Sequence, residues 1–485
     1  MKQIISYKLN NCFNSLKFAF LKNLIYSVIP MNKLLISGLV LAASALAVSC
    51  TPKQPAAPEQ TTMKKIVFPG DYPDPSIVRD GNDFYMTHSS FTYYPGLLVW
   101  HSTDLENWEP VSRAVGDQPY SIFAPEICKV GDKFYIYYPT SAGENYVVMA
   151  DNPAGPWSEP VKLAAGGIDP GHVYAENGKQ YLYTNNCYAV ELTDDGLAAA
   201  GEVFKPYDGW EFPADWETEG VWLESPKLFQ RGEYYYLVTA EGGTAGPPTS
   251  HMVVVARSKS AIGPWENMPT NPLVHTYSAD EEWWSKGHGT IFDDAEGNWY
   301  IVYHSYRNGY HTLGRTTIIE SIEWTEDGWP KLADANEAEG FVEDTPESAQ
   351  YATLRNYDNP LMWAKWEPGF DGAELQTITA VDRSYEVTAE FQLEAGAKAG
   401  LYLFYNNDAN FGLQGTEEHF FLRICNDKNV ATAEKSLDGE TWTTVESGVD
   451  VSGLHHNAFG GFFALRPAVL TSGNAKLVKF DYKAL

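Results

Sequence analysis

Several kinds of chemistry are excluded by what this 485-residue chain lacks or has little of. Its five cysteines form no CxxC pair and no Cys/His pattern with metal-ligand spacing. The phosphate-binding GxxxxGK[ST] loop and the GxSxG turn of serine hydrolases are both absent. Basic residues are scarce, with 34 Lys and Arg against 63 Asp and Glu, and the net charge of −29 would repel nucleic acid or an anionic membrane surface. A neutral ligand is therefore expected.

One unit recurs five times between about residue 70 and residue 305: a polar element, an apolar stretch, a turn and a Tyr-rich strand. Each unit predicts a β-hairpin, because its turn carries Gly, Asn or Asp and its flanks are aromatic or β-branched. The turns are Asp80-Gly81-Asn82, Gly131-Asp132, Asn177-Gly178, Gly232 and Gly297-Asn298. A repeat about every 45–65 residues is typical of β-propeller blades, and no window in this region has a convincing helical period. The pattern predicts an all-β fold with a five-bladed β-propeller over residues 65–335; a β-sandwich with coincidentally similar hairpins is the alternative.

A second domain is predicted beyond an acidic linker at residues 336–350. From about residue 351 to residue 485 apolar side chains alternate with polar ones, as at Tyr385, Val387 and Ala389, and again at Val478, Phe480 and Tyr482. The segment Ser436–Trp442 is a strong hairpin signal. These features predict a β-sandwich of jelly-roll or lectin-like kind, which either supports the first domain or binds glycan.

The N-terminal residues predict targeting rather than fold. Residues 1–30 are interpreted as an upstream extension from a misplaced start. Residues 31–50, MNKLLISGLVLAASALAVSC, resemble a bacterial lipoprotein signal that ends at a lipidated Cys50, with a plain secretory signal as the alternative. Residues 51–64 read as a Pro- and Ala-rich tether. The prediction is an exported lipoprotein of a Gram-negative-type cell envelope, periplasmic or outer-membrane associated, that contacts membrane only through its lipid.

The polar residues that open the repeats should converge, because the innermost strand of every propeller blade lines the central channel. They are Asp74, Glu126, Asp169, Glu224 and His288. Carboxylates gathered in a closed pocket cannot all stay ionised, so their pKa values separate into one base and one acid. Hydrolysis of a glycosidic bond needs such a pair. Taken alone, each Asp-Pro pair predicts a turn rather than a catalytic residue. Glu126 is a weaker catalytic candidate because it follows its proline rather than preceding it.

At these residues the chain resembles glycoside hydrolase family 43, whose five-bladed propeller carries an Asp base, a second Asp and a Glu acid. The matching segments are Tyr72–Ser76, Gly167–Pro170 and Trp222–Pro226, and the resemblance covers about residues 66–335. Phe123–Ile127 resembles the family's Trp-Ala-Pro-Asp motif but departs from it by Trp→Phe and Asp→Glu. Ser225 stands where Gly is more usual.

The resemblance implies an inverting mechanism in which Asp74 deprotonates water, Glu224 protonates the leaving oxygen, and Asp169 raises the pKa of the acid and orients it. Inversion needs room for water, which predicts Asp74 and Glu224 carboxyl groups about 6.5–9.5 Å apart.

Further site residues are predicted around these carboxylates. By the resemblance, Gly314-Arg315 holds the sugar in the first subsite, and His288 lies near the channel centre. There His288 either holds a Ca²⁺ through water or is a buried, hydrogen-bonded histidine; no cofactor is required. The aromatic rings of Phe91, Phe123, Trp222 and Trp283 are expected to stack on a pentose, with structural packing as the alternative for any one of them.

The sequence therefore predicts an exo-acting glycosidase that removes α-L-arabinofuranosyl or β-D-xylosyl residues from plant polysaccharides or oligosaccharides. A retaining, fructosidase-like propeller hydrolase is the enzymatic alternative. A lipid-anchored, glycan-binding propeller without catalysis is the non-enzymatic one.

Overall fold

The computed structural model of the chain describes residues 62–333 and 351–485, which belong to one compact unit. The predicted extension, the signal with Cys50, most of the tether and the linker at 336–350 lie outside the described residues. Within the described part, no helix is long and apolar enough to cross a bilayer.

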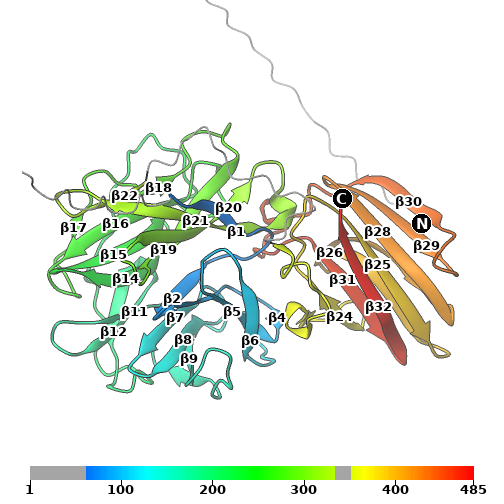
Figure 1. Cartoon of the computed structure of the whole chain (residues 1–485), viewed down its shortest axis with the longest axis horizontal. Coiled ribbons are helices and arrows are strands. Elements are labelled where there is room, and N and C mark those ends of the chain that lie inside the picture. Colours follow the sequence, from blue (N-terminus) through cyan, green and yellow to red (C-terminus); the bar gives the residue numbers. More distant parts are fainter. Residues whose placement is uncertain (1–61, 334–350) are drawn as a thin grey trace, which may run out of the picture. The chain divides into compact units, whose positions relative to one another are not determined.

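Five separate antiparallel sheets form the first part of the fold, coloured blue to green in Figure 1. The first contains β2 (Ser76–Asp80), β3 (Asp83–Thr87), β5 (Gly96–Ser102) and β6 (Glu109–Val115). The second contains β7 (Glu126–Val130), β8 (Lys133–Pro139), β9 (Asn145–Ala150) and β10 (Val161–Leu163). The third contains β11 (Gly171–Tyr174), β12 (Gln180–Thr184) and β13 (Tyr188–Glu191), with the short 3₁₀ turn η1 (Asn185–Cys187) between the last two.

The fourth sheet contains β14 (Glu224–Arg231), β15 (Tyr234–Glu241), β16 (Met252–Ser258), β17 (Glu266–Asn267) and β18 (Val274–His275). The fifth contains β19 (Trp283–Asp293), β20 (Trp299–Arg307), β21 (Arg315–Trp324) and β22 (Pro330–Leu332), with η2 (His311–Leu313) before β21. The N-terminal strand β1 (Lys64–Phe68) pairs with β21 and completes this sheet.

The sheets are the predicted propeller blades. The first strands of successive blades contact one another in a ring, β2 to β7 to β11 to β14 to β19 and back to β2. All five predicted hairpins are present, and the turn glycines Gly81, Gly131, Gly178, Gly232 and Gly297 all have positive φ. The prediction of a five-bladed propeller is confirmed, and the ring brings the first residues of each blade together.

The second part of the fold is the predicted β-sandwich, coloured yellow to red in Figure 1. One sheet has the order β27 (Ala409–Gly415), β26 (Lys398–Asn406), β31 (Arg466–Ser472), β24 (Glu374–Thr377), β23 (Ala364–Trp366) and β4 (Tyr93–Tyr94). The other has the order β30 (Thr443–Asp450), β29 (Val430–Ser436), β28 (His419–Asp427), β25 (Ser384–Leu393) and β32 (Ala475–Ala484). Short helical turns are η4 (Pro360–Met362) and α1 (His456–Phe459).

The alternation predicted for these strands is right for β25 and wrong at Val478. Tyr385, Val387 and Ala389 are buried in the sandwich core. In β32 the pairing shifts register between Glu390 and Phe391, so that Phe391 faces Leu477 and Val478 is 48% exposed. A β-bulge of this kind reverses the side-chain phase of a strand, and the sequence pattern alone does not reveal it.

Propeller and sandwich share a buried, polar contact. Strand β4 comes from the propeller segment but pairs with β23 of the sandwich. The Arg466 guanidinium on β31 lies 3.0 Å from the carboxylate of Asp71, and both side chains are buried. The other oxygen of Asp71 accepts a hydrogen bond from the Arg315 backbone N–H at 3.3 Å, so the sandwich is connected to a predicted site residue.

Candidate active site

The predicted catalytic residues stand where the inner strands begin. Asp74 precedes β2, Asp169 precedes β11, Glu224 is the first residue of β14, and His288 lies within β19. Asp74, Asp169 and His288 have φ of 58°, 55° and 57°, in the left-handed region that residues other than Gly seldom adopt. Such conformations cost on the order of 1 kcal/mol or more each and cluster at functional sites. Their coincidence at three equivalent blade positions points to function.

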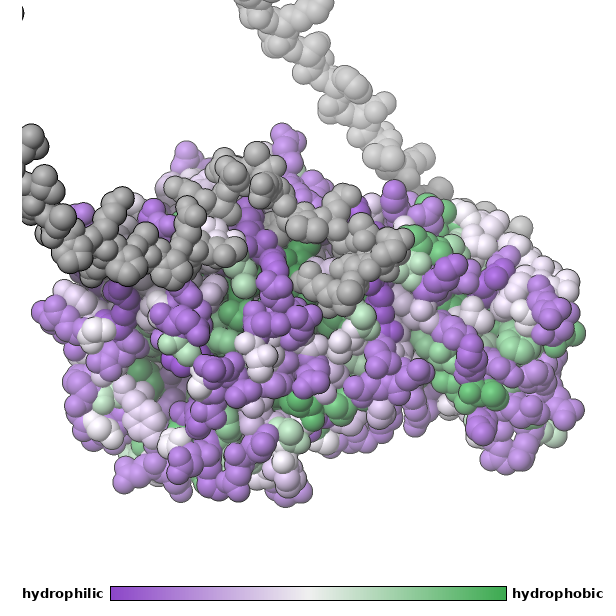
Figure 2. Space-filling model, viewed as in Figure 1, coloured by the Kyte–Doolittle hydropathy of each residue, from purple (hydrophilic) through white to green (hydrophobic). Residues whose placement is uncertain are grey.

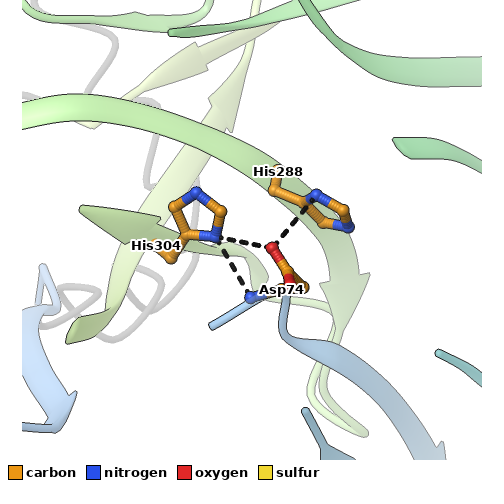
Figure 3. A group of neighbouring side chains, drawn as sticks. All are labelled: Asp74, His288 and His304. Carbon is orange, nitrogen blue, oxygen red and sulfur yellow. Dashed lines mark hydrogen bonds and ion pairs between the residues drawn. The ribbon is translucent and has the colours of Figure 1, made fainter. Parts of the chain in front are cut away.

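Asp74 is buried among donors. Its Oδ1 lies 2.8 Å from Arg315 Nη1, and the Ser89 hydroxyl donates to its Oδ2 at 2.5 Å. Figure 3 shows the carboxylate between two imidazole rings, with Nδ1 of His288 at 3.4 Å and Nδ1 of His304 at 3.1 Å from Oδ1. Burial alone would raise the pKa of Asp74, but Arg315 and these contacts outweigh it and hold the pKa well below its usual value. Asp74 is therefore an ionised carboxylate.

Asp169 and Glu224 form a close pair on neighbouring blades. Carboxylate oxygens of both lie, with a ring nitrogen of His288, within 4.8 Å of one another. The Ser225 backbone N–H, next to Glu224, donates to Asp169 Oδ2 at 3.3 Å. The strands can approach because Gly171 has no side chain: a Cβ there would lie 1.6 Å from the Pro226 carbonyl oxygen. A larger residue at position 171 would push the two carboxylates apart.

The environment of this pair favours protonation. Burial first, and then the nearby charge of Asp74, raise the pKa of Asp169 to about 7, although Lys227 opposes the rise. Burial, Asp169 and Asp74 together raise the pKa of Glu224 well above its usual value. The pKa values of Asp74 and Glu224 are thus moved apart, downward for Asp74 and upward for Glu224, which is the separation that acid–base hydrolysis requires.

Two buried histidines were not among the predicted site residues. Nε2 of His251, at the residue before β16, lies 3.7 Å from Glu224 Oε1, and burial keeps its pKa well below the usual value. Nδ1 of His304 lies 3.1 Å from both the backbone nitrogen and Oδ1 of Asp74, and its Nε2 lies 3.1 Å from Thr244 Oγ1. Burial lowers the pKa of His304 to about 4, so the ring is neutral. Neither residue opens a repeat, and neither belongs to a segment that matched the family motifs, so no signal in the sequence pointed to them.

Arg315 is directed at Asp74 by its own backbone. Gly314 has φ of 79°, and a Cβ there would lie 2.3 Å from Asp71 Oδ1, so only glycine allows this approach. The Arg315 guanidinium is also 5.7 Å from the Phe91 ring and 5.3 Å from the ring of Phe462. Phe462 belongs to the sandwich and precedes β31, so the second domain contributes a ring to the surroundings of the carboxylates. No feature of the sequence indicated this contact.

The predicted aromatic residues occupy different surroundings. Phe91 is buried, and its ring centroid lies 6.2 Å from that of the half-buried Phe123. Trp222, two residues before Glu224, has φ of 41° and is 58% exposed. Trp283 is buried in the large propeller core, and it lines a cavity of about 260 Å³ together with Val381 and Asp382. The first three lie at or near residues of the carboxylate site, whereas Trp283 packs in the core.

Glu126 has a structural partner. Its Oε2 lies 2.7 Å from the Lys227 ammonium, and the Ser76 hydroxyl donates to the same oxygen at 2.9 Å. Glu126, which stands in the Phe123–Ile127 segment where the family motif has Asp, therefore reaches a buried lysine on β14.

Two groups of side chains have the spacing of a metal site, and neither fits a directly bound Ca²⁺. In the group of Asp74, His288 and His304, the Asp74 oxygen is already paired with the Arg315 cation, and Ca²⁺ prefers oxygen ligands to imidazole. In the group of Asp169, Glu224 and His288, a cation would ionise the carboxyl group that is held protonated. Within the described part of the chain, Nε2 of His288 is buried and has no hydrogen-bond partner. We identify none of these residues as a direct metal ligand.

The site points to a class of protein, because Asp74, with a lowered pKa, and Glu224, with a raised pKa, both lie beside His288, and glycoside hydrolases use such a separated pair to cleave a glycosidic bond. Residues 63–330 match the sequence profile of glycosyl hydrolases family 43. The match spans more than half of the chain, and the chain belongs to this family.

Three relatives illustrate the similarity. A xylosidase/arabinosidase of Butyrivibrio fibrisolvens is 35% identical over 299 residues, 54% of this chain and 55% of the relative. A xylan 1,3-beta-xylosidase of Vibrio sp is 31% identical, over 56% of this chain and 58% of the relative. The non-reducing end alpha-L-arabinofuranosidase BoGH43B of Bacteroides ovatus is 31% identical, over 59% of this chain and 55% of the relative. The chain thus spans little more than half the length of these relatives.

Solved structures resemble the whole fold. The GH43 protein BlXynB from Bacillus licheniformis has a TM-score of 0.72 at 22% identity, covering 88% of this chain and 100% of that chain. A xylan beta-1,4-xylosidase from Bacillus halodurans C-125 has a TM-score of 0.72 at 24% identity, covering 87% and 100%. At such identities the likeness shows the fold, a propeller followed by a β-sandwich.

Proposed function

We propose that the protein is an inverting, exo-acting glycosidase that releases α-L-arabinofuranosyl or β-D-xylosyl residues from plant polysaccharides or their oligosaccharides. The observation that carries the proposal is a pair of carboxyl groups beside one buried histidine, His288, whose pKa values shift in opposite directions, downward for Asp74 and upward for Glu224. The names of the relatives, which include xylosidases and arabinofuranosidases, support the choice of sugar.

In the proposed reaction, ionised Asp74 takes a proton from a water molecule, and the water oxygen attacks the anomeric carbon. The glycosidic C–O bond breaks on the opposite face of the sugar, and Glu224 gives its proton to the leaving oxygen. Asp169 orients Glu224 and keeps it protonated, a role supported by the effect of Asp169 on the pKa of Glu224. The sugar lies against Arg315, Phe91, Phe123 and Trp222.

Release of p-nitrophenol and of poorer leaving groups from arabinofuranosides and xylosides tests this proposal. We expect Asp74→Asn to lose roughly 10²–10⁴-fold in kcat/KM on every substrate, as for loss of a general base. Glu224→Gln should lose as much on poor leaving groups and much less on p-nitrophenol, which needs little protonation. Equal activity of Glu224→Gln and wild type on poor leaving groups would contradict the assignment. No turnover by wild type on a broad pentoside panel would favour a binding protein instead.

Product stereochemistry tests the inverting step separately. Proton NMR of the first-formed sugar should show the anomer opposite to that of the substrate. The same anomer would require a covalent intermediate and would favour the retaining alternative.

We also propose that Cys50 carries a lipid and holds the protein in the cell envelope. The signal-like segment before this cysteine supports the proposal. Labelling of the expressed chain with a radioactive fatty acid should disappear in Cys50→Ser; labelling that persists would contradict it.

Finally, we propose that His288 holds a Ca²⁺ in the channel through a water molecule. The buried, unpartnered Nε2 supports this. Ca²⁺ should then raise the Tm of wild type and not that of His288→Phe; an equal rise in both would place the ion elsewhere.

A further inference from the structure

A buried ion pair lies behind the catalytic carboxylates. Lys227, three residues after Glu224 on β14, and Glu126, the first residue of β7, have side-chain exposures of 3% and 10%. Their Nζ and Oε2 atoms are 2.7 Å apart. The ammonium also donates to the backbone carbonyl oxygens of Pro125 and Pro170, both at 3.0 Å. Since a lysine ammonium has three protons, its hydrogen-bonding capacity is fully used.

These bonds join the segments that carry all three carboxylates. Pro170 directly follows Asp169, and Lys227 lies on the same strand as Glu224. Ser76, two residues after Asp74, donates to Glu126 Oε2 at 2.9 Å and accepts the Ile127 backbone N–H at 3.0 Å. One ammonium and its counter-ion thus connect the strands on which base, acid and orienting carboxylate stand.

Stability alone explains such a pair poorly. Removing two charges from water costs several kcal/mol per ion, and well-packed apolar side chains of similar volume are often as stable or more so. The charge of Lys227 has a second effect, because it opposes the rise in the pKa of Asp169 that burial and Asp74 cause. An apolar side chain could not supply this field.

We propose that Lys227 is a positioning residue of the reaction: its ammonium holds the Asp169 segment against the Glu224 strand and supplies positive charge behind this carboxylate pair, with Glu126 as its counter-ion. The inference rests on the proposed function, since it concerns how that pair is kept ready for proton transfer. Lys227 does not contact substrate and acts through Asp169.

The test compares two variants with opposite expected effects on the pH profile of kcat/KM. Lys227→Met removes the positive charge, so the Asp169–Glu224 pair should keep its proton to higher pH, and the alkaline limb should rise by about 0.5–1 pH unit. Glu126→Gln leaves the ammonium without its counter-charge, and the alkaline limb should fall. The alkaline limb of the double variant Lys227→Met/Glu126→Gln should lie between those of the two single variants. Because the double variant leaves no unpaired buried charge, it should fold even if a single variant does not.

A purely structural ion pair predicts otherwise. It would lower the Tm of all the variants and leave the alkaline limb unmoved, or would move it in the same direction in both single variants. Either result would overturn the proposal.

A second readout needs no substrate and separates this inference from the proposed function. The pKa of Asp169 is about 7 in the folded protein, above its ordinary value, so the folded state binds the extra proton and unfolding free energy falls as pH rises toward 7. Urea unfolding between pH 5 and 9 should show this fall extending to higher pH in Lys227→Met and in the double variant. If wild type hydrolyses no pentoside but the decrease in unfolding free energy extends to higher pH in these variants, the effect of the Lys227 charge on Asp169 is shown and the substrate assignment is wrong. If the fall does not move, the inference fails regardless of activity.

Discussion

The Arg315 guanidinium, which is expected to hold the sugar, also lies 2.8 Å from Asp74, the proposed general base. Its positive charge contributes to the low pKa of Asp74, together with His288 and His304 and against the effect of burial. A base must be ionised to accept a proton, so the acidic limb of kcat/KM reports this pKa. We predict that Arg315→Met moves the acidic limb to higher pH by at least about one unit.

The matched control for this prediction is Arg315→Lys. It keeps the positive charge but loses the planar donor fork, so the acidic limb should stay near that of wild type while KM rises. An acidic limb unchanged in Arg315→Met would mean that His288, His304 and the Ser89 hydroxyl suffice to keep Asp74 ionised. The pH profiles of the three proteins on one aryl pentoside measure the effect.

The repeat phase in the sequence indicated the carboxylates of the site and His288, and the family resemblance indicated Arg315, but neither indicated His251 or His304. Asp74, Asp169, Glu224 and His288 each stand at the start of or within an inner strand, and a ring of blades necessarily brings such positions together. His251 precedes the third strand of its blade, and its ring lies beside Glu224 and against Gly287 of the next blade, where a Cβ would be 1.9 Å away. No spacing rule in one sequence relates such a residue to Glu224.

At the scale of elements, the segment from α1 to β31 of the sandwich reaches the site. Phe462 lies between these elements; its ring centroid is 3.8 Å from that of His456 and 5.3 Å from the Arg315 guanidinium carbon. We predict that Phe462→Ala raises KM for pentosides roughly 2–10-fold, the loss expected for one aromatic contact, with a smaller change in kcat.

Phe459 on α1 provides the control in the same segment. Its side chain is 44% exposed, and its ring contacts Tyr405 of the sandwich at 6.1 Å rather than the site. Phe459→Ala should leave KM unchanged. A KM equally raised in both variants would indicate that the segment merely folds less well, and an unchanged KM in Phe462→Ala would remove the sandwich from the subsite.

The contact of Phe462 with Arg315 could not be predicted from the sequence. Strands such as β25 and β28 show the alternation that a sequence pattern can reveal, because every second side chain in them is buried. The docking of a loop from one domain on another depends on tertiary contacts such as Arg466 with Asp71, in which a charge on β31 is neutralised near residue 70. Residues almost 400 positions apart leave no local pattern, so the support or glycan-binding role predicted for the sandwich did not include a share in the site.

At the scale of the whole molecule, acidic charge governs which substrates approach. The chain carries a formal net charge of −29, and the face in Figure 2 is largely hydrophilic. The negative charge of the protein does not repel a neutral arabinoxylan fragment, whereas it repels a fragment that bears uronic acids. The Debye length falls from about 30 Å at 0.01 M salt to about 8 Å at 0.15 M. We therefore predict that added NaCl raises kcat/KM several-fold for uronic acid-bearing oligosaccharides and leaves it unchanged for neutral ones of equal length. Salt that raised both equally would act on the enzyme itself, and salt that raised neither would mean that the charge is too distant from the pocket to matter.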